Sequence, residues 1–378
     1  MWYRANGDTY EYIGTHTDDL MVASKEVERV FNELKKFYSF KATDAPKYHL
    51  GVDYVYLWVN GKMQYEMGSF TYIAEVLGRV KEVLGVENLR TSNFPIRNKY
   101  QPEQDESPIL DQEHHLKYQQ LIGIGVWLVA IGRFDIAYAI SSLSRFSACP
   151  RVNHLMELKR VFEYLNKFPD RRIRIDSSDP PDIGERVGPP EADFSQQYPD
   201  AKEEVDPKFP KPKGRSLSTS VWFDSDHAHD KVTFRSITGL ITYVGSTPVY
   251  WASKRQGAIE TSTYGAEFVA GRVAAVEAIS IRYLLRSLGV PIKGETTIYG
   301  DNLGMLQSSS IPEAVLKKKH CAISFHKVRE CVAARILKCY KVQSNVNRAD
   351  LMTKAMSGIS IKRLGSLIWS QRPFPRPG

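Results

Sequence analysis

Four acidic residues in the C-terminal half of the chain have the types and spacing for metal-dependent chemistry. They are Asp224, Glu267, Asp301 and Asp350. Carboxylate oxygens are the hard ligands that Mg²⁺ or Mn²⁺ prefers. Two such ions held about 4 Å apart can generate a hydroxide and stabilise a leaving oxygen, as phosphodiester cleavage requires. Four acids are enough to ligate both ions, so the set predicts a centre for two divalent cations.

Predicted strands and helices position these acids. Apolar, β-branched runs predict strands, and apolar residues at helical period predict helices. The strands are expected over 218–224, 239–245, 249–252, 296–300 and 336–342, and the helices over 263–288, after 302 and from 347 onward. Asp224 and Asp301 then stand at strand ends, and Glu267 lies in the first turns of a helix. Asp301 also precedes a helix, whose dipole favours the charged carboxylate.

Five short motifs occur in a fixed order in this part of the chain. They are Asp224-Ser-Asp226, Ser262-Thr-Tyr-Gly-Ala-Glu267, Asp301-Asn302, Lys319-His320 with a later His326, and Ala349-Asp350-Leu-Met-Thr-Lys354. The series resembles the ribonuclease H domain of copia-type long-terminal-repeat retrotransposons. One departure is Tyr264-Gly265, which stands where the family usually has Glu-Ala-like residues, although Glu267 keeps its place.

This resemblance implies both a fold and an activity for residues 217–357. The fold is α/β, with a ribonuclease H-like five-stranded mixed sheet and flanking helices. The activity is hydrolysis of the RNA strand of an RNA–DNA hybrid, with the same four acids as ligands of two Mg²⁺ or Mn²⁺ ions. His320 or His326 is a candidate for assisting proton transfer, because imidazole titrates near neutral pH.

A second resemblance covers the N-terminal part of the chain. The pair Asp18-Asp19 lies between two strand-like runs and resembles the palm hairpin of a reverse transcriptase, with His16 in place of the usual tyrosine. An amphipathic helix is expected over 26–40, and further matching stretches are 48–56, 118–123, 133–146 and 154–165. The resemblance implies an α+β palm remnant over 1–105 and a helical thumb or connection over 106–175.

The hairpin by itself is not expected to polymerise DNA. A further palm aspartate and nucleotide-holding fingers would be needed, and neither fits into the residues before Asp18. We therefore expect the chain to begin inside the polymerase domain and not to extend a primer alone. The alternative is that a longer polyprotein or a separate polypeptide supplies the missing half. The chain would then be the C-terminal piece of a complete RNA-directed DNA polymerase.

Composition divides the rest of the chain. Hydrophobic residues make up 42% and charged residues 25% of the 378, as in soluble globular proteins. Residues 176–216 hold 8 of the 20 prolines and no sustained apolar period, which predicts a flexible linker before the nuclease region, and 358–378 is expected to be a tail. The linker carries a net charge of −4 and the remainder +12. This balance favours a polyanionic partner, an RNA–DNA hybrid or a primer–template.

Several residues are expected to contact nucleic acid. Those expected beside the acids, on loops or at a helix start, are Lys254, Arg255, Asn302, Lys318 and Lys319. Those expected to follow phosphates from the thumb helices are Lys159, Arg160, Lys167, Arg171 and Arg172. A solvated turn or helical face is the alternative for both sets. Tyr138, Phe146, Phe162 and Tyr164 are expected in the core.

No apolar run of membrane-spanning length and no signal peptide is present in the sequence. We expect an intracellular protein, cytoplasmic or nuclear, or within a virus-like particle if the element is active. Cys149, Cys321, Cys331 and Cys339 suit a reducing compartment. Three of them lie near His320, which raises the question of zinc, but without a Cys-x-x-Cys pair we expect buried free thiols.

Two classes of function stay open on the sequence alone. The first is an active nuclease, and the second is a non-catalytic relic that binds nucleic acid. The complete set of four acids favours the first, whereas the short palm region favours decay in that part of the chain. The pattern does not predict an oligomeric state.

Overall fold

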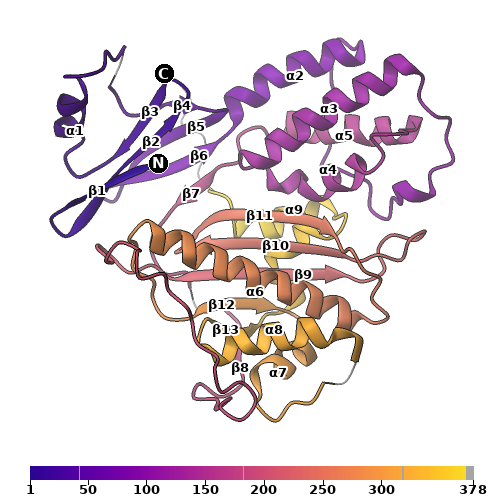
Figure 1. Cartoon of the computed structure of the whole chain (residues 1–378). Helices are drawn as coiled ribbons and strands as arrows, with labels where there is room; N and C mark the ends of the chain where they lie inside the picture. Colours follow the sequence, from indigo (N-terminus) through magenta and orange to yellow (C-terminus); the bar gives the residue numbers. More distant parts are fainter. Residues whose placement is uncertain (42, 182, 317–318, 372–378) are drawn as a thin grey trace.

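The computed structural model describes residues 1–41, 43–181, 183–316 and 319–371. Its described strands form three sheets, with strand orders β1-β2-β3, β4-β5-β6-β7 and β11-β10-β9-β12-β13-β8. The two small sheets and a group of helices occupy the N-terminal part, and the six-stranded sheet lies below them in Figure 1. None of the described helices combines the length and apolar character that a membrane crossing requires.

The N-terminal hairpins are short and largely solvated. The first sheet consists of β1 (Trp2–Asn6), β2 (Thr9–His16) and β3 (Asp19–Ala23), and the second of β4 (Tyr48–His49), β5 (Val52–Val59), β6 (Lys62–Gly68) and β7 (Ile173–Ile175). Between them α1 (Val27–Leu34) is shorter than the helix predicted over 26–40. Only Val30 of α1 is buried, so little tertiary packing is present to stabilise further helical turns.

The central helices lie mainly in the region predicted to be helical over 106–175, but the first of them precedes it, in the part predicted as palm. They are α2 (Phe70–Leu84), α3 (Gln112–Ala130), α4 (Ala137–Ser144) and α5 (Val152–Lys167), with the 3₁₀ turns η1 (Pro102–Gln104) and η2 (Phe134–Ile136). Tyr138, Phe162 and Tyr164 are buried as expected, and Phe146 is half-buried. The side chain of Asp111 caps α3 by accepting from the backbone N–H of His114.

The C-terminal sheet confirms the predicted mixed architecture, but it has six strands rather than the five expected, because Glu185–Val187 adds a strand at its edge. Its meander is β9 (Thr219–Asp226), β10 (Ile237–Val244) and β11 (Thr247–Arg255), and β12 (Thr296–Gly300) and β13 (Leu337–Lys341) follow in parallel with β9. The helices are α6 (Thr263–Ser287), α7 (Leu303–Ser310) and α8 (Ala322–Ala333). Parallel pairing needs crossovers, which α6 and the α7–α8 segment supply.

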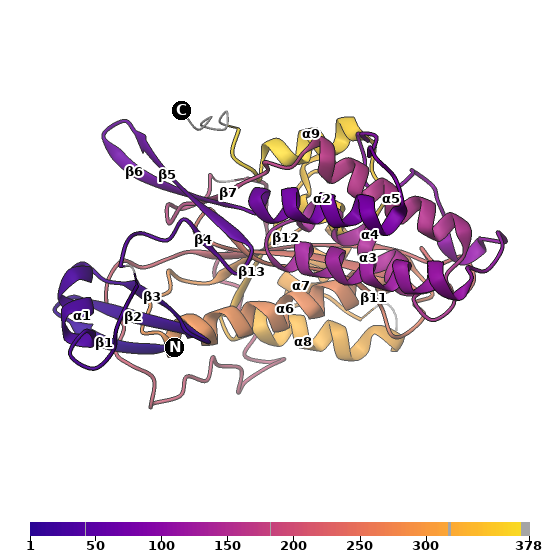
Figure 2. The ribbon, with the colours of Figure 1, turned by 90° about the horizontal axis from the view of Figure 1, so that it is seen from above.

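Alternating residues of β9 face two different cores. Val221 and Phe223 pack with the core beneath α6 and α8, whereas Trp222 joins the core that contains the central helices. Figure 2 shows the sheet between α6 and α8 on one side and α2 to α5 with α9 on the other. Because both faces are covered, the inner strand reads as a continuous apolar run rather than an alternating one.

The segment 176–216, predicted to be a flexible linker, instead packs against the sheet. β8 (Glu185–Val187) pairs antiparallel with β13. Phe194 is buried against Arg329, and the Glu203 carboxylate lies 2.6 Å from the guanidinium of Arg282. These contacts are made by single residues that do not repeat at a regular interval along the sequence. Composition and periodicity therefore did not predict them.

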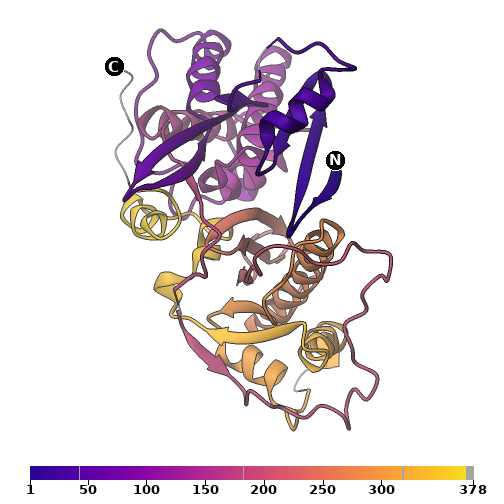
Figure 3. The same ribbon diagram turned by 90° about the vertical axis from the view of Figure 1, so that its left-hand side faces the viewer.

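The predicted tail is also structured. It contains α9 (Gly358–Ser366), and Trp369 stacks on Phe134 with ring centroids 5.0 Å apart. The guanidinium of Arg171 lies 4.5 Å from the Trp369 ring centre. Figure 3 shows α9 between the central helices and the six-stranded sheet. Residues of α9 and Trp369 therefore join the core that both halves share.

We expect Trp369→Ala to lower the free energy of unfolding by about 3–5 kcal/mol, because it opens a cavity in this shared core. Leu367→Ala is the matched control, since Leu367 is 40% exposed and should change stability little. Urea denaturation of the full chain measures both. Equal effects of the two substitutions would show that the tail does not support the fold.

Candidate active site

Three of the predicted acids meet at one edge of the six-stranded sheet. Asp224 lies on β9, and Asp301 follows directly after β12, which pairs with β9 in parallel through Tyr299 and Trp222. Continuing this register brings Asp301 to the level of Asp224. Glu267 reaches the same place from the second turn of α6. One carboxylate oxygen from each of the three lies within 4.8 Å of the others.

Asp350 joins this group through a lysine. It lies on the 3₁₀ turn η5 (Arg348–Met352), where a regular closing helix was expected. Lys354 Nζ lies 3.0 Å from Asp350 Oδ1 and 3.7 Å from Asp224 Oδ2. The four predicted acids are therefore neighbours, with the ammonium of Lys354 between two of them.

The turn around Asp350 is fixed by side chains to which the sequence analysis gave no role. Buried Asn347 donates from Nδ2 to the Phe223 carbonyl at 3.0 Å, and its Oδ1 accepts from Ala349 N at 3.2 Å. Thr353 Oγ1 donates to Asp224 Oδ2 at 2.5 Å. These bonds hold the chain in a tight turn on β9, which explains why a regular helix does not begin here.

Gly239 permits this turn to approach the sheet. It pairs with Asp224 across β10 and β9. A Cβ atom at position 239 would lie 2.7 Å from the Ala349 carbonyl oxygen and 2.6 Å from a Thr353 methyl group. A larger residue would push η5, and Asp350 with it, away from Asp224.

Burial and mutual repulsion disfavour the charged forms of these acids. Burial raises the pKa of Glu267 well above its usual range, and the charges of Asp224 and Asp301 add to the effect. Burial also raises the pKa of Asp301. The pKa of Asp350 rises to about 7 through burial and the charge of Asp224, although Lys354 opposes the rise. Close carboxylates in a poorly solvated place cannot all ionise without a cation.

The residues fit divalent metal ions. Glu267 Oε2 is buried and has no hydrogen-bond partner among the described residues, so one ligand atom is left for a cation. The other donors are carboxylate oxygens, which suit Mg²⁺ or Mn²⁺. Positive charge between the acids would relieve the repulsion that raises their pKa values.

Neither predicted histidine joins the carboxylates. His320 Nε2 lies 3.4 Å from Glu260 Oε2, in a separate group with Cys321. His326 Nδ1 lies 2.7 Å from the hydroxyl of Tyr198 on the segment before β9. The expectation that one of them assists at the acids is therefore not supported by the geometry.

The residues expected to bind nucleic acid near the acids have varied surroundings. Asn302 caps α7 by accepting from Met305 N at 3.0 Å. Lys254 and Arg255 lie on β11 rather than on a loop, and Arg255 pairs with Asp230 at 3.2 Å. Lys319 is exposed in the 3₁₀ turn η3 (Lys319–Cys321). Lys318 lies outside the described residues.

Most of the cations expected along the thumb helices have internal partners. Arg172 is buried with its guanidinium 2.7 Å from Glu66, Arg171 lies 3.3 Å from Asp135, and Arg160 lies 3.3 Å from Glu157. Phosphate contact is therefore the wrong expectation for Arg172, because its charge is already neutralised inside the fold.

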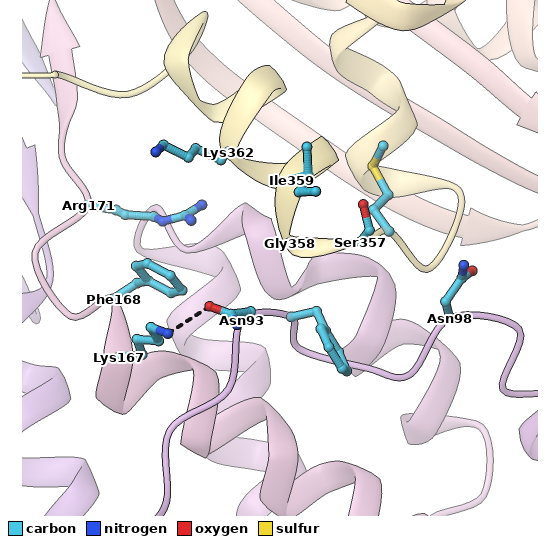
Figure 4. A pocket seen from close by; sticks show the side chains of 11 residues that line it. Asn93, Asn98, Lys167, Phe168, Arg171, Ser357, Gly358, Ile359 and Lys362 are labelled. Carbon is cyan, nitrogen blue, oxygen red and sulfur yellow. Dashed lines mark hydrogen bonds between the residues drawn. The ribbon is translucent and has the colours of Figure 1, made fainter.

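A pocket of about 690 Å³ lies between α5 and α9, away from the carboxylates. Lys167 lines it and donates from Nζ to Asn93 Oδ1 at 2.7 Å, drawn as a dashed line in Figure 4. Arg171 and Lys362 face the same space (Figure 4). The pocket belongs to the junction that α9 makes with the central helices.

The two strand-like runs around Asp18 and Asp19 pair as a hairpin. β2 and β3 are joined by a tight turn in which Thr17 has a φ of 52°, and Asp18 and Asp19 are exposed. The Asp19 carboxylate lies 3.2 Å from His49 Nδ1.

The raised pKa values predict how stability depends on pH without metal. A carboxyl group whose pKa is raised by folding stabilises the fold below its unfolded pKa, near 4, and this stabilisation is lost as pH rises through the folded value, about 7 for Asp350. We expect the free energy of unfolding to fall by on the order of 1–3 kcal/mol between pH 5 and pH 8. Adding Mg²⁺ should reduce the fall.

Asp301→Asn should weaken this pH dependence, because it removes one of the repelling charges and keeps the shape of the side chain. Asp18→Asn, at the exposed hairpin tip, is the control and should leave the profile unchanged. Thermal and urea melts at both pH values, with and without Mg²⁺, measure the effect. A profile that is the same in Asp301→Asn and in the unchanged chain would remove Asp301 from the group.

Comparison with known proteins finds relatives by sequence. No protein-family model matches the chain. It is 25% identical, over 98% of its length, to the retrovirus-related Pol polyprotein from transposon RE1 of Arabidopsis thaliana, and 23% identical, over 90%, to that from transposon TNT 1-94 of Nicotiana tabacum. It is also 25% identical, over 73%, to the putative transposon Ty5-1 protein YCL074W of Saccharomyces cerevisiae.

The coverage of these relatives is unequal. The chain spans 22% of the RE1 polyprotein and 23% of the TNT 1-94 polyprotein, but 77% of the yeast protein. Among solved structures, the N-terminal RNase H domain of Rv2228c from Mycobacterium tuberculosis, fused to maltose binding protein, matches 40% of this chain and 96% of its own. The identity is 13% and the TM-score 0.29.

RNase H1 of Halobacterium salinarum gives a similar result, with 16% identity and a TM-score of 0.28 over 36% of this chain and 94% of its own. The sequence relatives cover the N-terminal part as well as the sheet that carries the acids. The homologues of this chain are thus retrovirus-related Pol polyproteins of copia-type transposons, as the order of its motifs predicts.

Proposed function

We propose that residues 217–357 act as a ribonuclease H-type endonuclease that cleaves the RNA strand of RNA–DNA hybrids. The observation that carries the proposal is the meeting of Asp224, Glu267 and Asp301, with oxygens within 4.8 Å of one another, at the edge of a mixed sheet. Asp350 is linked to them through Lys354. The similarity to transposon Pol polyproteins supports a role on nucleic acid.

The four acids would hold two Mg²⁺ or Mn²⁺ ions. Bound divalent ions supply activation of water and stabilisation of the departing 3′-oxygen. The chain's own part is positioning. Thr353 fixes one oxygen of Asp224, and Asn347 fixes the turn that carries Asp350. Lys354 screens Asp224 from Asp350 when they are charged together.

The substrate is proposed from charge and from general differences between nucleic acids. The chain has a net charge of +8, and Lys254 and Lys319 are exposed, so both remain candidates for phosphate contact. An RNA strand paired with DNA can be recognised by 2′-hydroxyl groups across a wide minor groove. This recognition would separate a hybrid from duplex DNA.

The N-terminal part is proposed to be the palm-like and thumb-like region of a reverse transcriptase. The exposed turn carrying Asp18 and Asp19 and the four helices α2 to α5 support this assignment. The expected boundary near 175 passes through one continuous core, because Ile173, Trp222 and Trp369 belong to it together.

We expect the purified full chain to cut RNA only when it is hybridised to DNA, and only with Mg²⁺ or Mn²⁺ present. Labelled hybrid, duplex RNA and duplex DNA are the three substrates. Cutting of all three at the same rate contradicts the substrate proposal. Binding of the hybrid without any cutting contradicts the nuclease and supports the non-catalytic relic.

Asp224→Asn should lower the hybrid-cleavage rate by about 100-fold or more, since losing even an outer partner of a metal ligand costs about 10–100-fold. Asp193→Asn is the matched control, because Asp193 is exposed and its side chain accepts a local hydrogen bond from Ser195 N. Circular dichroism confirms that both variants are folded. A cleavage rate in Asp224→Asn equal to that of the control would exclude Asp224 as a ligand.

A further inference from the structure

A second group of metal-ligand atoms lies close to the first turn of α6. Glu260 precedes the helix, and His320 and Cys321 belong to η3, some sixty residues later. The carboxylate, imidazole and thiol each have a ligand atom within 4.8 Å of the others. The cysteine spacing alone gave no reason to expect a site, because Glu260 supplies the ligand that a second cysteine would otherwise provide.

The distances approach those of a tetrahedral zinc site. With Zn–N and Zn–O bonds of about 2.0–2.1 Å, neighbouring ligand atoms in a tetrahedron lie about 3.4 Å apart. His320 Nε2 and Glu260 Oε2 are 3.4 Å apart, and Cys321 Sγ and Glu260 Oε2 are 4.0 Å apart. Only a small movement of the thiol is needed to complete three corners.

Charge also favours a cation at this place. Glu260 is 9% exposed, and in the part of the chain that the structure describes no lysine or arginine forms an ion pair with it. Its carboxylate partners are a titratable imidazole and a thiol, which is a weak donor. A buried carboxylate with such partners is poorly compensated. Zn²⁺ would supply the missing charge.

Gly265 keeps the space between the ligands open. A Cβ atom there would lie 2.4 Å from Glu260 Oε2, 3.1 Å from Cys321 Sγ and 3.2 Å from His320 Nε2. Glycine inside a helix is about 1 kcal/mol less favourable than alanine. The lack of space for a Cβ atom beside this cluster explains why glycine stands here. It is also one of the two positions at which the chain departs from the family pattern.

The backbone of Glu260 is tied to the strand that carries Asp224. His227 Nε2 lies 2.9 Å from the Glu260 carbonyl oxygen, and His227 directly follows β9. Ser262 caps α6 by accepting from Gly265 N at 3.2 Å. The cluster therefore lies between the end of β9 and the start of the helix that carries Glu267.

We propose that Glu260, His320 and Cys321 form a zinc site that is distinct from the carboxylate centre. The Cys321 thiol gives up a proton to solvent when the ion binds, and water fills the fourth position. Zinc selects this site because thiolate and imidazole are softer ligands than the four carboxylates, which suit Mg²⁺. The ion joins η3 to the segment just before α6, and so supports the start of the helix that carries Glu267.

Metal binding to the full chain tests the proposal without reference to nuclease activity. The protein is stripped with EDTA, exchanged into buffer with excess Mg²⁺, and titrated with Zn²⁺ or with Co²⁺ as a spectroscopic probe. We expect one tightly bound Zn²⁺ per chain and, for Co²⁺, a thiolate charge-transfer band with the visible spectrum of a tetrahedral site. Absence of stoichiometric zinc binding, or a Co²⁺ spectrum without the thiolate band, overturns the proposal.

Variants locate the ion. Cys321→Ser should abolish the thiolate band and weaken zinc binding at least tenfold, whereas Cys149→Ser, at an exposed cysteine, should change neither. His320→Gln and Gly265→Ala are second tests if Cys321→Ser does not fold, and both should weaken zinc binding. Equal zinc affinity in Cys321→Ser and Cys149→Ser, or in His320→Gln and the unchanged chain, would show that Glu260 and His320 form an ordinary ion pair.

Discussion

The structure depends on holding like-charged carboxylates together where little water reaches them. Burial and mutual repulsion raise the pKa values of Glu267, Asp301 and Asp350, so the cluster opposes folding when its members are charged. The parallel register of β9 with β12 nonetheless brings Asp301 to Asp224, and the packing of α6 and η5 on β9 adds Glu267 and Asp350. Lys354 offsets part of the repulsion between two of them. Bound cations would offset the remaining repulsion between the carboxylates.

The packing around the carboxylates supplies the stabilisation that offsets their repulsion. The inner strand β9 is covered on both faces, by α6 and α8 on one side and by the shared core on the other. Trp369 contributes to this cover, since its ring stacks on Phe134 and also contacts the guanidinium of Arg171. The acids are thus placed by a core that extends across the central helices and the nuclease sheet, not by the sheet alone.

The two metal centres that we propose differ in ligand chemistry. The first offers only carboxylate oxygens, whereas the second combines a carboxylate with an imidazole and a thiol. Glu267 would belong to the first centre, and the second would hold the segment just before the helix that carries Glu267. This division lets hard and soft cations bind without competing.

The sequence by itself determined five strands of the C-terminal sheet and the long helix α6, and it singled out the four acids, because period and motif order can be read along the chain. Tertiary structure decided what has no local period. Asn347 and Thr353 fix Asp350 and Asp224 through contacts across more than a hundred residues. Phe194 and Trp369 anchor segments that composition marked as linker and tail. Glu260 lies beside His320 only because α6 and η3 pack together. The number of residues between them in the sequence does not predict this contact.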